Sequence, residues 1–195
     1  MEKYTEIIKR GGIGVIPTDT IYGLVGSAFS EMAVNKIKKT KGRSIGKGLT
    51  VLVSSVEDIK KFNIEVSEKA KIFMQKFWPG RLSISLFVNN KKFDYLCADD
   101  HTFSFRLPDN KVLQDFLRES GPIIAPSANP EGFPPAKNIV EAKKYFGDSV
   151  DFYMDGGDIS GLPSTVVQII DGKLSVLREG AIKSNDIIKT WNEIK

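Results

Sequence analysis

The spacing of apolar residues along the chain switches between that of amphipathic helices and that of strands. Apolar positions three and four apart predict helices, and Ser30 and Ser67 precede two of them as residues suited to accept the first free backbone amides. Helices are accordingly predicted over residues 2–10, 30–39, 67–77, 110–118 and 139–146. Short apolar runs and alternating patterns predict strands over residues 13–16, 49–53, 82–86, 102–107, 123–124, 150–154, 166–170 and 174–178. Ser55 and Asp58 have the spacing of a capping box.

The order of these elements predicts an α/β fold with a mixed sheet, because strands and helices do not alternate as strictly as in a parallel β-α-β protein. Asp171-Gly172 would turn the last two strands into a hairpin. Strand 82–86 alternates large apolar residues with serine, which is typical of a half-buried strand. Residues 40–48, rich in glycine and in basic residues, would form a loop. No repeat or linker is evident, and one domain over residues 1–195 is predicted.

Composition narrows the class of protein. Hydrophobic residues make up 41% of the chain, and 12 phenylalanines and two tryptophans can fill a core. Cys97 is the single cysteine, which excludes a disulfide framework and favours a reducing compartment. Residues 1–10 lack the apolar core of a signal peptide, and no apolar run approaches the roughly 20 residues of a membrane helix. A cytoplasmic protein without membrane attachment is therefore expected. The net charge of +4 is compatible with an anionic ligand or a nucleic acid.

Several familiar catalytic motifs are incomplete in this chain. Residues 42–47 are one residue short of a phosphate-binding P-loop, and Gly48 replaces the serine or threonine that would bind magnesium. The glycines within 11–14 precede a strand, whereas those of a dinucleotide-binding fingerprint follow one. His101, the single histidine, has no G-x-S-x-G elbow to supply a serine nucleophile. Residues 99–101 (Asp-Asp-His) could contact a metal ion, but three adjacent side chains more often form a solvated turn.

Four segments of small polar and basic residues remain, at predicted strand ends and in glycine-rich loops. They read PTDTIYGL (17–24), KGRSIGKGL (41–49), APSAN (125–129) and GLPSTVV (161–167). Hydroxyl groups and cations at strand ends are typical of a site that binds and orients substrates which supply the reactivity themselves. A structural interpretation competes for the first three segments: residues 17–24 could be a turn whose amides Asp19 caps, residues 41–49 a solvated basic loop, and residues 125–129 an ordinary turn.

Individual side chains in and near these segments leave alternatives open. Arg178 would lie near Ser164 if the last two strands pair as a hairpin. Ser127 and Asn129, two apart in an extended segment, would point to the same side. Arg106 would be buried and would need a carboxylate partner. That carboxylate could belong to a substrate or to a structural ion pair.

Together with FWPG at 77–80, FRLPD at 105–109 and LREG at 177–180, these segments resemble the YrdC/TsaC family of threonylcarbamoyl-AMP synthases in order and spacing. The resemblance runs from about residue 12 to residue 182. The family's K-x-R and S-x-N signatures correspond to Lys41 with Arg43 and to Ser127 with Asn129.

The resemblance implies a fold and an activity. The fold would be a twisted mixed α/β sheet with flanking helices around a basic concave cavity. The activity would be the condensation of L-threonine, bicarbonate or CO2, and ATP accompanied by Mg²⁺, to threonylcarbamoyl-AMP and pyrophosphate. This product would serve the threonylcarbamoyladenosine modification of tRNA, so tRNA and the transferase subunits that pass on the threonylcarbamoyl group are the implied partners.

The resemblance also implies roles for individual residues. L-threonine would be bound by Thr20, Arg106 and Ser164. ATP would be bound by Lys41, Arg43, Lys47, Thr102, Ser127, Asn129 and Arg178. Neither a catalytic base nor a metal ligand is implied. Many relatives have a histidine where this chain has Leu52, so that contact with threonine would be absent or replaced.

Two other functions are compatible with the same architecture. The first is carbamoyl transfer, because the same domain also occurs within carbamoyltransferases, which are larger proteins with several domains. An RNA-binding module of the same fold, without adenylation activity, is the alternative from a different functional class. The chain has neither an RNP1 motif nor an interleaved basic and aromatic patch, and this favours the enzyme.

Overall fold

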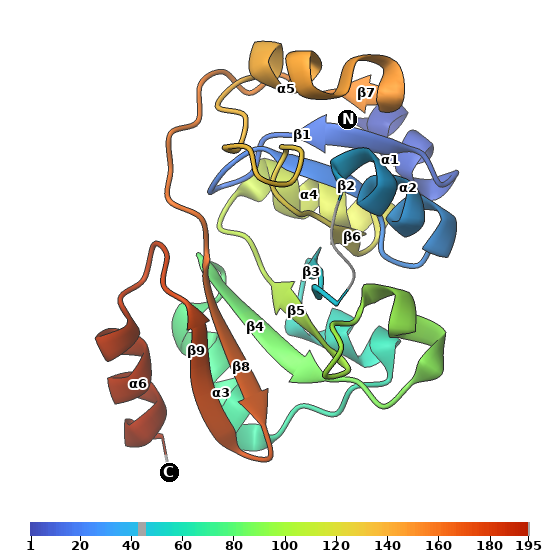
Figure 1. Cartoon of the computed structure of the whole chain (residues 1–195). Coiled ribbons are helices and arrows are strands. Elements are labelled where there is room, and N and C mark those ends of the chain that lie inside the picture. The colour runs from blue at the N-terminus through green and yellow to red at the C-terminus, as the bar shows by residue number, and fades with distance from the viewer. Residues whose placement is uncertain (43–45, 195) are drawn as a thin grey trace.

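A twisted mixed β-sheet runs through the residues that the computed structural model describes, 1–42 and 46–194 (Figure 1). The strands are β1 (Ile13–Ile16), β2 (Gly23–Ser27), β3 (Thr50–Leu52), β4 (Leu82–Phe87), β5 (Thr102–Arg106), β6 (Ile123–Ile124), β7 (Phe152–Tyr153), β8 (Thr165–Ile170) and β9 (Lys173–Arg178). Across the sheet their order is β7-β1-β2-β6-β3-β5-β4-β8-β9. Strand β1 pairs with β7, β3 with β5 and β4 with β8 in parallel, and the other neighbours are antiparallel. The predicted mixed α/β sheet is confirmed.

Helices flank this sheet, and the expected serines begin two of them. The helices are α1 (Glu2–Lys9), α2 (Glu31–Lys41), α3 (Glu68–Phe77), α4 (Lys111–Ser120), α5 (Ile139–Phe146) and α6 (Ser184–Glu193), with shorter 3-10 helices η1 (Val56–Phe62), η2 (Lys91–Leu96) and η3 (Gly147–Ser149). Ser30 and Ser67 accept backbone amides at 3.2 and 3.3 Å, so both predicted caps are confirmed. The capping box of Ser55 and Asp58 is also present, at the start of η1. None of the described helices has the length and apolar character that a membrane crossing requires.

One face of the sheet changes from apolar to polar at strand β3. In the apolar part of this face, α1 and α4 cover β1, β2, β6 and the end of β3. The apolar cluster between them includes Phe116 and the buried Leu52. The register places Leu52 beside Arg106 of β5, and Ser104 of β5 beside Ser85 of β4. Beyond β3 this face therefore carries hydroxyl groups and a guanidinium, and it is here that a binding cavity can form.

Strand β4 is buried along both faces, so the prediction of a half-buried strand was wrong. Ser83 is fully buried and Ser85 is 3% exposed. On the serine side, the Ser83 hydroxyl is 2.9 Å from that of Ser164, which precedes β8, the parallel neighbour of β4 in the sheet. An alternating pattern identifies a strand with two different faces, but it does not establish that the polar face is open to solvent.

Besides short 3-10 helices, one strand and one α-helix were missing from the sequence prediction. Strand β2 contains two glycines and a serine, residues of low strand propensity, and its pairing with β1 and β6 determines its structure. Helix α6 has no side-chain cap, and the edge of Trp191 packs on Phe73 of α3 with ring centroids 5.2 Å apart. Both elements depend on tertiary contacts more than on local signals.

Candidate functional site

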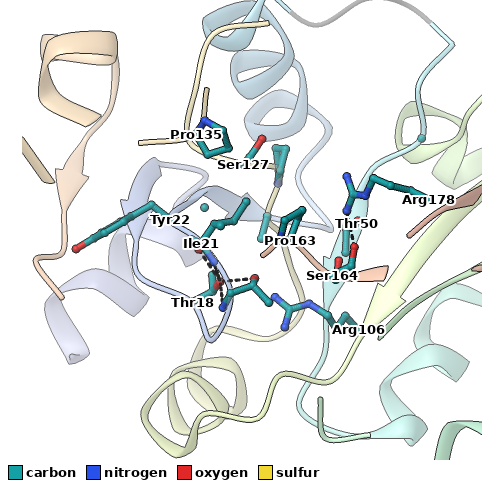
Figure 2. A pocket seen from close by; sticks show the side chains of 15 residues that line it. Thr18, Ile21, Tyr22, Thr50, Arg106, Ser127, Pro135, Pro163, Ser164 and Arg178 are labelled. Atoms are coloured by element: carbon teal, nitrogen blue, oxygen red, sulfur yellow. Dashed lines mark hydrogen bonds between the residues drawn. The ribbon is translucent and has the colours of Figure 1, made fainter. Parts of the chain in front are cut away.

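A concave pocket of about 220 Å³ lies where the turn after β1, the segment after β6 and the entry to β8 meet. Figure 2 shows the turn with Thr18 and Ile21 facing the side chains of Arg106 and Ser164. The hydroxyl groups of the lining belong to Thr18, Thr20, Tyr22, Thr50, Ser127 and Ser164. Among the described residues that line it, the charged ones are Arg106 and Arg178. The pocket is therefore basic and rich in hydroxyl groups, which suits a small anionic ligand.

Thr18 shapes the turn that carries Thr20 into the pocket. The Thr18 hydroxyl donates to the carbonyl of Ile21 at 2.6 Å and accepts the amides of Thr20 and Ile21, both at 3.2 Å. The Thr18 and Thr20 hydroxyl oxygens lie 3.0 Å apart. The sequence had offered Asp19 as a cap for these amides, but its carboxylate binds Arg106 and the amide of Asp109. Thr18 is the residue that accepts them.

Arg106 has a carboxylate partner within the chain. Its Nη1 lies 2.5 Å from Oδ1 of Asp19, and both side chains are only 5–6% exposed. The other Asp19 oxygen accepts the amide of Asp109 at 3.2 Å. The structural ion pair that the sequence left open therefore exists. Because Arg106 also lines the pocket, the pair fixes one edge of the guanidinium and does not exclude a ligand at another.

Ser164 and Arg178 meet at the entry to the hairpin, as the sequence predicted. Strands β8 and β9 pair in antiparallel fashion around Asp171-Gly172. Arg178 donates from Nη2 to the carbonyl of Ser164 at 2.8 Å. The Ser164 hydroxyl is paired with that of Ser83, a contact that sequence reasoning missed, because the two residues lie 81 positions apart.

Lys41 contacts both residues of the S-x-N signature. It is the last residue of α2, so the prediction of a loop from residue 40 onward was wrong by two residues. Its buried Nζ lies 2.7 Å from each of the carbonyl oxygens of Ser127 and Asn129, 3.2 Å from the Ser127 hydroxyl and 3.1 Å from Oδ1 of Asn129. The two side chains do point to one side. Asn129 donates in turn to the carbonyls of Pro130 and Phe133.

Other residues implied in ATP binding lie outside this pocket or outside the described chain. Thr102 begins β5, about 13 Å along the strand from Arg106, and its hydroxyl donates to Asp100 at 2.7 Å. Lys47 lines a second cavity and forms an ion pair with Glu131. Arg43 lies outside the described residues. The pocket thus unites Thr20, Arg106, Ser164, Ser127 and Arg178 but neither Lys47 nor Thr102.

Leu52 does not extend the pocket. It is 1% exposed and packs in the apolar cluster beneath α4, although its register partner is Arg106. The pocket lining also includes Tyr22 and Pro163, which the sequence placed within motifs without giving them a role.

The segment Asp99-Asp100-His101 is an exposed turn, as predicted. In the part of the chain that the structure describes, no group of three or more histidine, cysteine, aspartate and glutamate side chains could hold a metal ion. Cys97 lies nearby and is half-buried. Burial, with a smaller contribution from Asp94 and Asp100, raises the pKa of its thiol to about 11. The thiol is therefore a poor nucleophile at neutral pH.

Replacing Cys97 with serine should leave turnover within about twofold of the wild-type value, because the thiol lies outside the pocket and stays protonated. Steady-state rates of the two proteins, normalised to the folded fraction, test this. A loss of turnover above tenfold in a folded variant would instead indicate a nucleophilic thiol.

Comparisons with known proteins agree with the fold and the motifs. The family model Sua5/YciO/YrdC, described as telomere recombination, matches residues 6–180. A relative from Mycobacterium tuberculosis is 34% identical over 182 residues, which are 92% of this chain and 83% of its own length. The threonylcarbamoyl-AMP synthase of Bacillus subtilis is 32% identical over 93% of this chain.

Solved structures extend the agreement to three dimensions. Sua5 of Pyrococcus abyssi, crystallised with L-threonine, matches 99% of this chain at a TM-score of 0.88 and 29% identity. YciO of Escherichia coli matches 97% at a TM-score of 0.85, and at 24% identity it supports the fold alone. The chain spans 57% of the Pyrococcus protein and 53% of the Bacillus one. On the family match and these similarities, the chain belongs to the Sua5/YciO/YrdC family.

Proposed function

We propose that this protein is an L-threonylcarbamoyladenylate synthase, a nucleotidyltransferase that condenses L-threonine, bicarbonate or CO2, and ATP. The observation that carries the proposal is the convergence of Thr20, Arg106 and Ser164 in one basic pocket of about 220 Å³. That volume suits an amino acid together with part of a nucleotide. The relatives named threonylcarbamoyl-AMP synthase, and the relative crystallised with L-threonine, support the same activity.

The amino-acid end of the pocket is assigned to the side where Arg106 and Thr20 lie. A guanidinium recognises a carboxylate through two parallel hydrogen bonds, and Arg106 has Asp19 on one edge only. The hydroxyls of Thr20 and Ser164, which line the same pocket, would bind the polar groups of threonine. Leu52 has no part in this contact, because it is enclosed in the apolar cluster.

The nucleotide end is assigned to Ser127 and Arg178, which line the same pocket, with Lys47 and Arg43 from the basic segment. Mg²⁺ would accompany ATP. The lining offers hydroxyl groups and guanidinium groups but no carboxylate among the described residues, so the metal would be held by phosphate oxygens. Bound in this way, Mg²⁺ would neutralise charge on the phosphates.

The reaction requires the pocket to orient two steps. The uncharged amine of threonine attacks the carbon of CO2, or of bicarbonate with loss of water, and a proton leaves the nitrogen. A carbamate oxygen then attacks the α-phosphorus of ATP in line, and pyrophosphate departs. Holding the reactants in one pocket can lower the barrier by about 7–11 kcal/mol. No described residue of the lining is assigned as a base. The product would pass to tRNA through separate transferase subunits.

Incubation with ATP, Mg²⁺, bicarbonate and ¹⁴C-labelled threonine tests the proposal. Threonine-dependent release of pyrophosphate, together with a labelled product that migrates as an acyl-adenylate, is the expected result. Omission of bicarbonate after degassing should abolish both signals. Salt-sensitive tRNA binding without threonine-dependent pyrophosphate release would contradict the enzyme and favour the RNA-binding alternative.

Replacing Arg43 or Lys47 with alanine should weaken ATP binding more than threonine binding. Each variant would remove one charged hydrogen bond to phosphate, about 1.5–3 kcal/mol. Because the Lys47 side chain is 56% exposed, the melting temperature of Lys47→Ala should hardly differ from that of the wild type. Calorimetric titration with each substrate measures the effect, and loss of threonine binding at unchanged ATP affinity would contradict the assignment.

A further inference from the structure

The end of an extended segment contributes to one wall of the pocket, and the segment is joined at two points to the turn that contributes to another. Between β7 and β8, residues 154–164 contain neither helix nor strand and run from one half of the sheet to the other (Figure 1). The segment ends at Pro163 and Ser164, which line the pocket. Both points of attachment lie on the turn that carries Thr20. The distance between the two walls is therefore set by local contacts.

The first point of attachment is the hydroxyl of Tyr22. This side chain is fully buried, and its oxygen accepts the amide of Gly156 at 2.9 Å while donating to the carbonyl of Gly157 at 2.8 Å. Burial raises the pKa of Tyr22, and Asp155 and Asp158 add to the shift, so the phenol stays a donor at neutral pH. One hydroxyl thus uses its donor and one acceptor position on consecutive residues of the segment.

The second point of attachment is a close backbone contact at Gly161. A Cβ atom built on Gly161 would lie 2.4 Å from the carbonyl oxygen of Thr20, which leaves no room for any side chain. Glycine is needed here for close approach. Three residues later, Ser164 is held from the other side by the Ser83 hydroxyl and by Arg178. A displacement at Gly161 must therefore be absorbed over the short stretch that leads to Ser164.

We propose that Tyr22 and Gly161 are positioning residues, which hold Ser164 against Thr20 and so set the width of the amino-acid end of the pocket. This inference rests on the proposed function and adds to it two residues that touch no reacting atom. A fixed width matters for selectivity, because a pocket that encloses the substrate methyl group can favour threonine over serine. A wider pocket would retain catalysis at saturating threonine but lose this preference.

The test compares Gly161→Ala and Tyr22→Phe with two matched variants elsewhere. Gly12→Ala introduces a similar overlap, 2.4 Å from a side-chain carbon of Ile7 and 2.9 Å from its carbonyl oxygen, at the far end of β1. Tyr153→Phe removes a hydroxyl that donates to the carbonyl of Gly147 at 2.7 Å. We expect at least a tenfold higher KM for threonine in the two test variants, with the KM for ATP within threefold of wild type. The threonine-to-serine ratio of kcat/KM should fall at least fivefold, and both control variants should match wild type.

Hydrogen exchange gives a readout that does not depend on activity. In Tyr22→Phe the amides of Gly156 and Ile159, which donate to the Tyr22 hydroxyl and to the carbonyl of Lys137, should exchange at least tenfold faster, while those of β4 and β5 keep their protection. Equal increases in the KM of both substrates, or an unchanged threonine preference in folded Tyr22→Phe, would overturn the positioning role. If the wild-type protein forms no threonylcarbamoyl-AMP at all, the proposed function fails first, and the exchange experiment still decides whether Tyr22 holds the segment.

Discussion

Replacing Arg106 with lysine should raise the KM for threonine at least tenfold, about 1.4 kcal/mol, while leaving the KM for ATP nearly unchanged. Lysine keeps the positive charge but cannot donate two parallel hydrogen bonds to a carboxylate. It also cannot satisfy Asp19 and a substrate with the geometry that the planar guanidinium provides. Steady-state kinetics with each substrate varied in turn measures this split.

Asp19→Asn and Arg106→Ala separate binding from folding. Breaking a buried ion pair leaves one charge without its partner and costs about 3–5 kcal/mol of stability, so both variants should melt at lower temperature. Exposed Asp115, which pairs with Lys111 and Arg118 on the surface of α4, offers a control in Asp115→Asn that should hardly move the melting temperature. Unchanged threonine affinity in Arg106→Lys, together with a collapsed melting temperature, would contradict the substrate role of Arg106.

The elements with local signals were predictable from sequence, and those without were not. Ser30 and Ser67 mark helix starts by their own side-chain chemistry, and Asp171-Gly172 marks a turn, so the structure repeats the prediction at these positions. Strand β2 has no such signal, because Gly23–Ser27 becomes a strand only between β1 and β6. The burial of Ser83 likewise depends on Ser164, some eighty residues away in the chain.

The same distinction applies to the candidate site. Sequence motifs identified the segments that meet in the pocket, where residues 17–24 follow β1, residues 125–129 follow β6 and residues 161–167 lead into β8. They could not reveal which partner Arg106 has, since Asp19 and Arg106 are 87 positions apart. Nor could they distinguish Lys41 from the neighbouring basic residues. Lys41 is the last residue of helix α2, and its ammonium group contacts the backbone carbonyls of Ser127 and Asn129.

The contacts of Lys41 predict that its replacement lowers stability and affects both substrates, whereas replacement of Lys47 should affect ATP alone. Lys41→Met keeps the aliphatic stem but removes the ammonium group that contacts four oxygen atoms of Ser127 and Asn129. Two of these are backbone carbonyls: that of Ser127 would keep the amide of Asn129 as a donor, whereas that of Asn129 would lose the ammonium group, and the lost contacts should cost about 1–3 kcal/mol of stability. We expect a lower melting temperature, and a fall in kcat/KM of at least tenfold for both substrates, because the displaced segment carries Ser127.

Lys47→Ala is the matched comparison, because it removes an exposed ammonium group from the same basic segment. It should lower ATP affinity alone and leave the melting temperature unchanged, whereas Lys41→Met should alter stability and both substrates together. Lys41→Arg also keeps a positive charge, but the larger guanidinium does not fit the compact set of four acceptors and should not restore activity. If Lys41→Met melted like wild type and lost only ATP affinity, the ammonium group would act on phosphate and not as a support for the segment around Ser127.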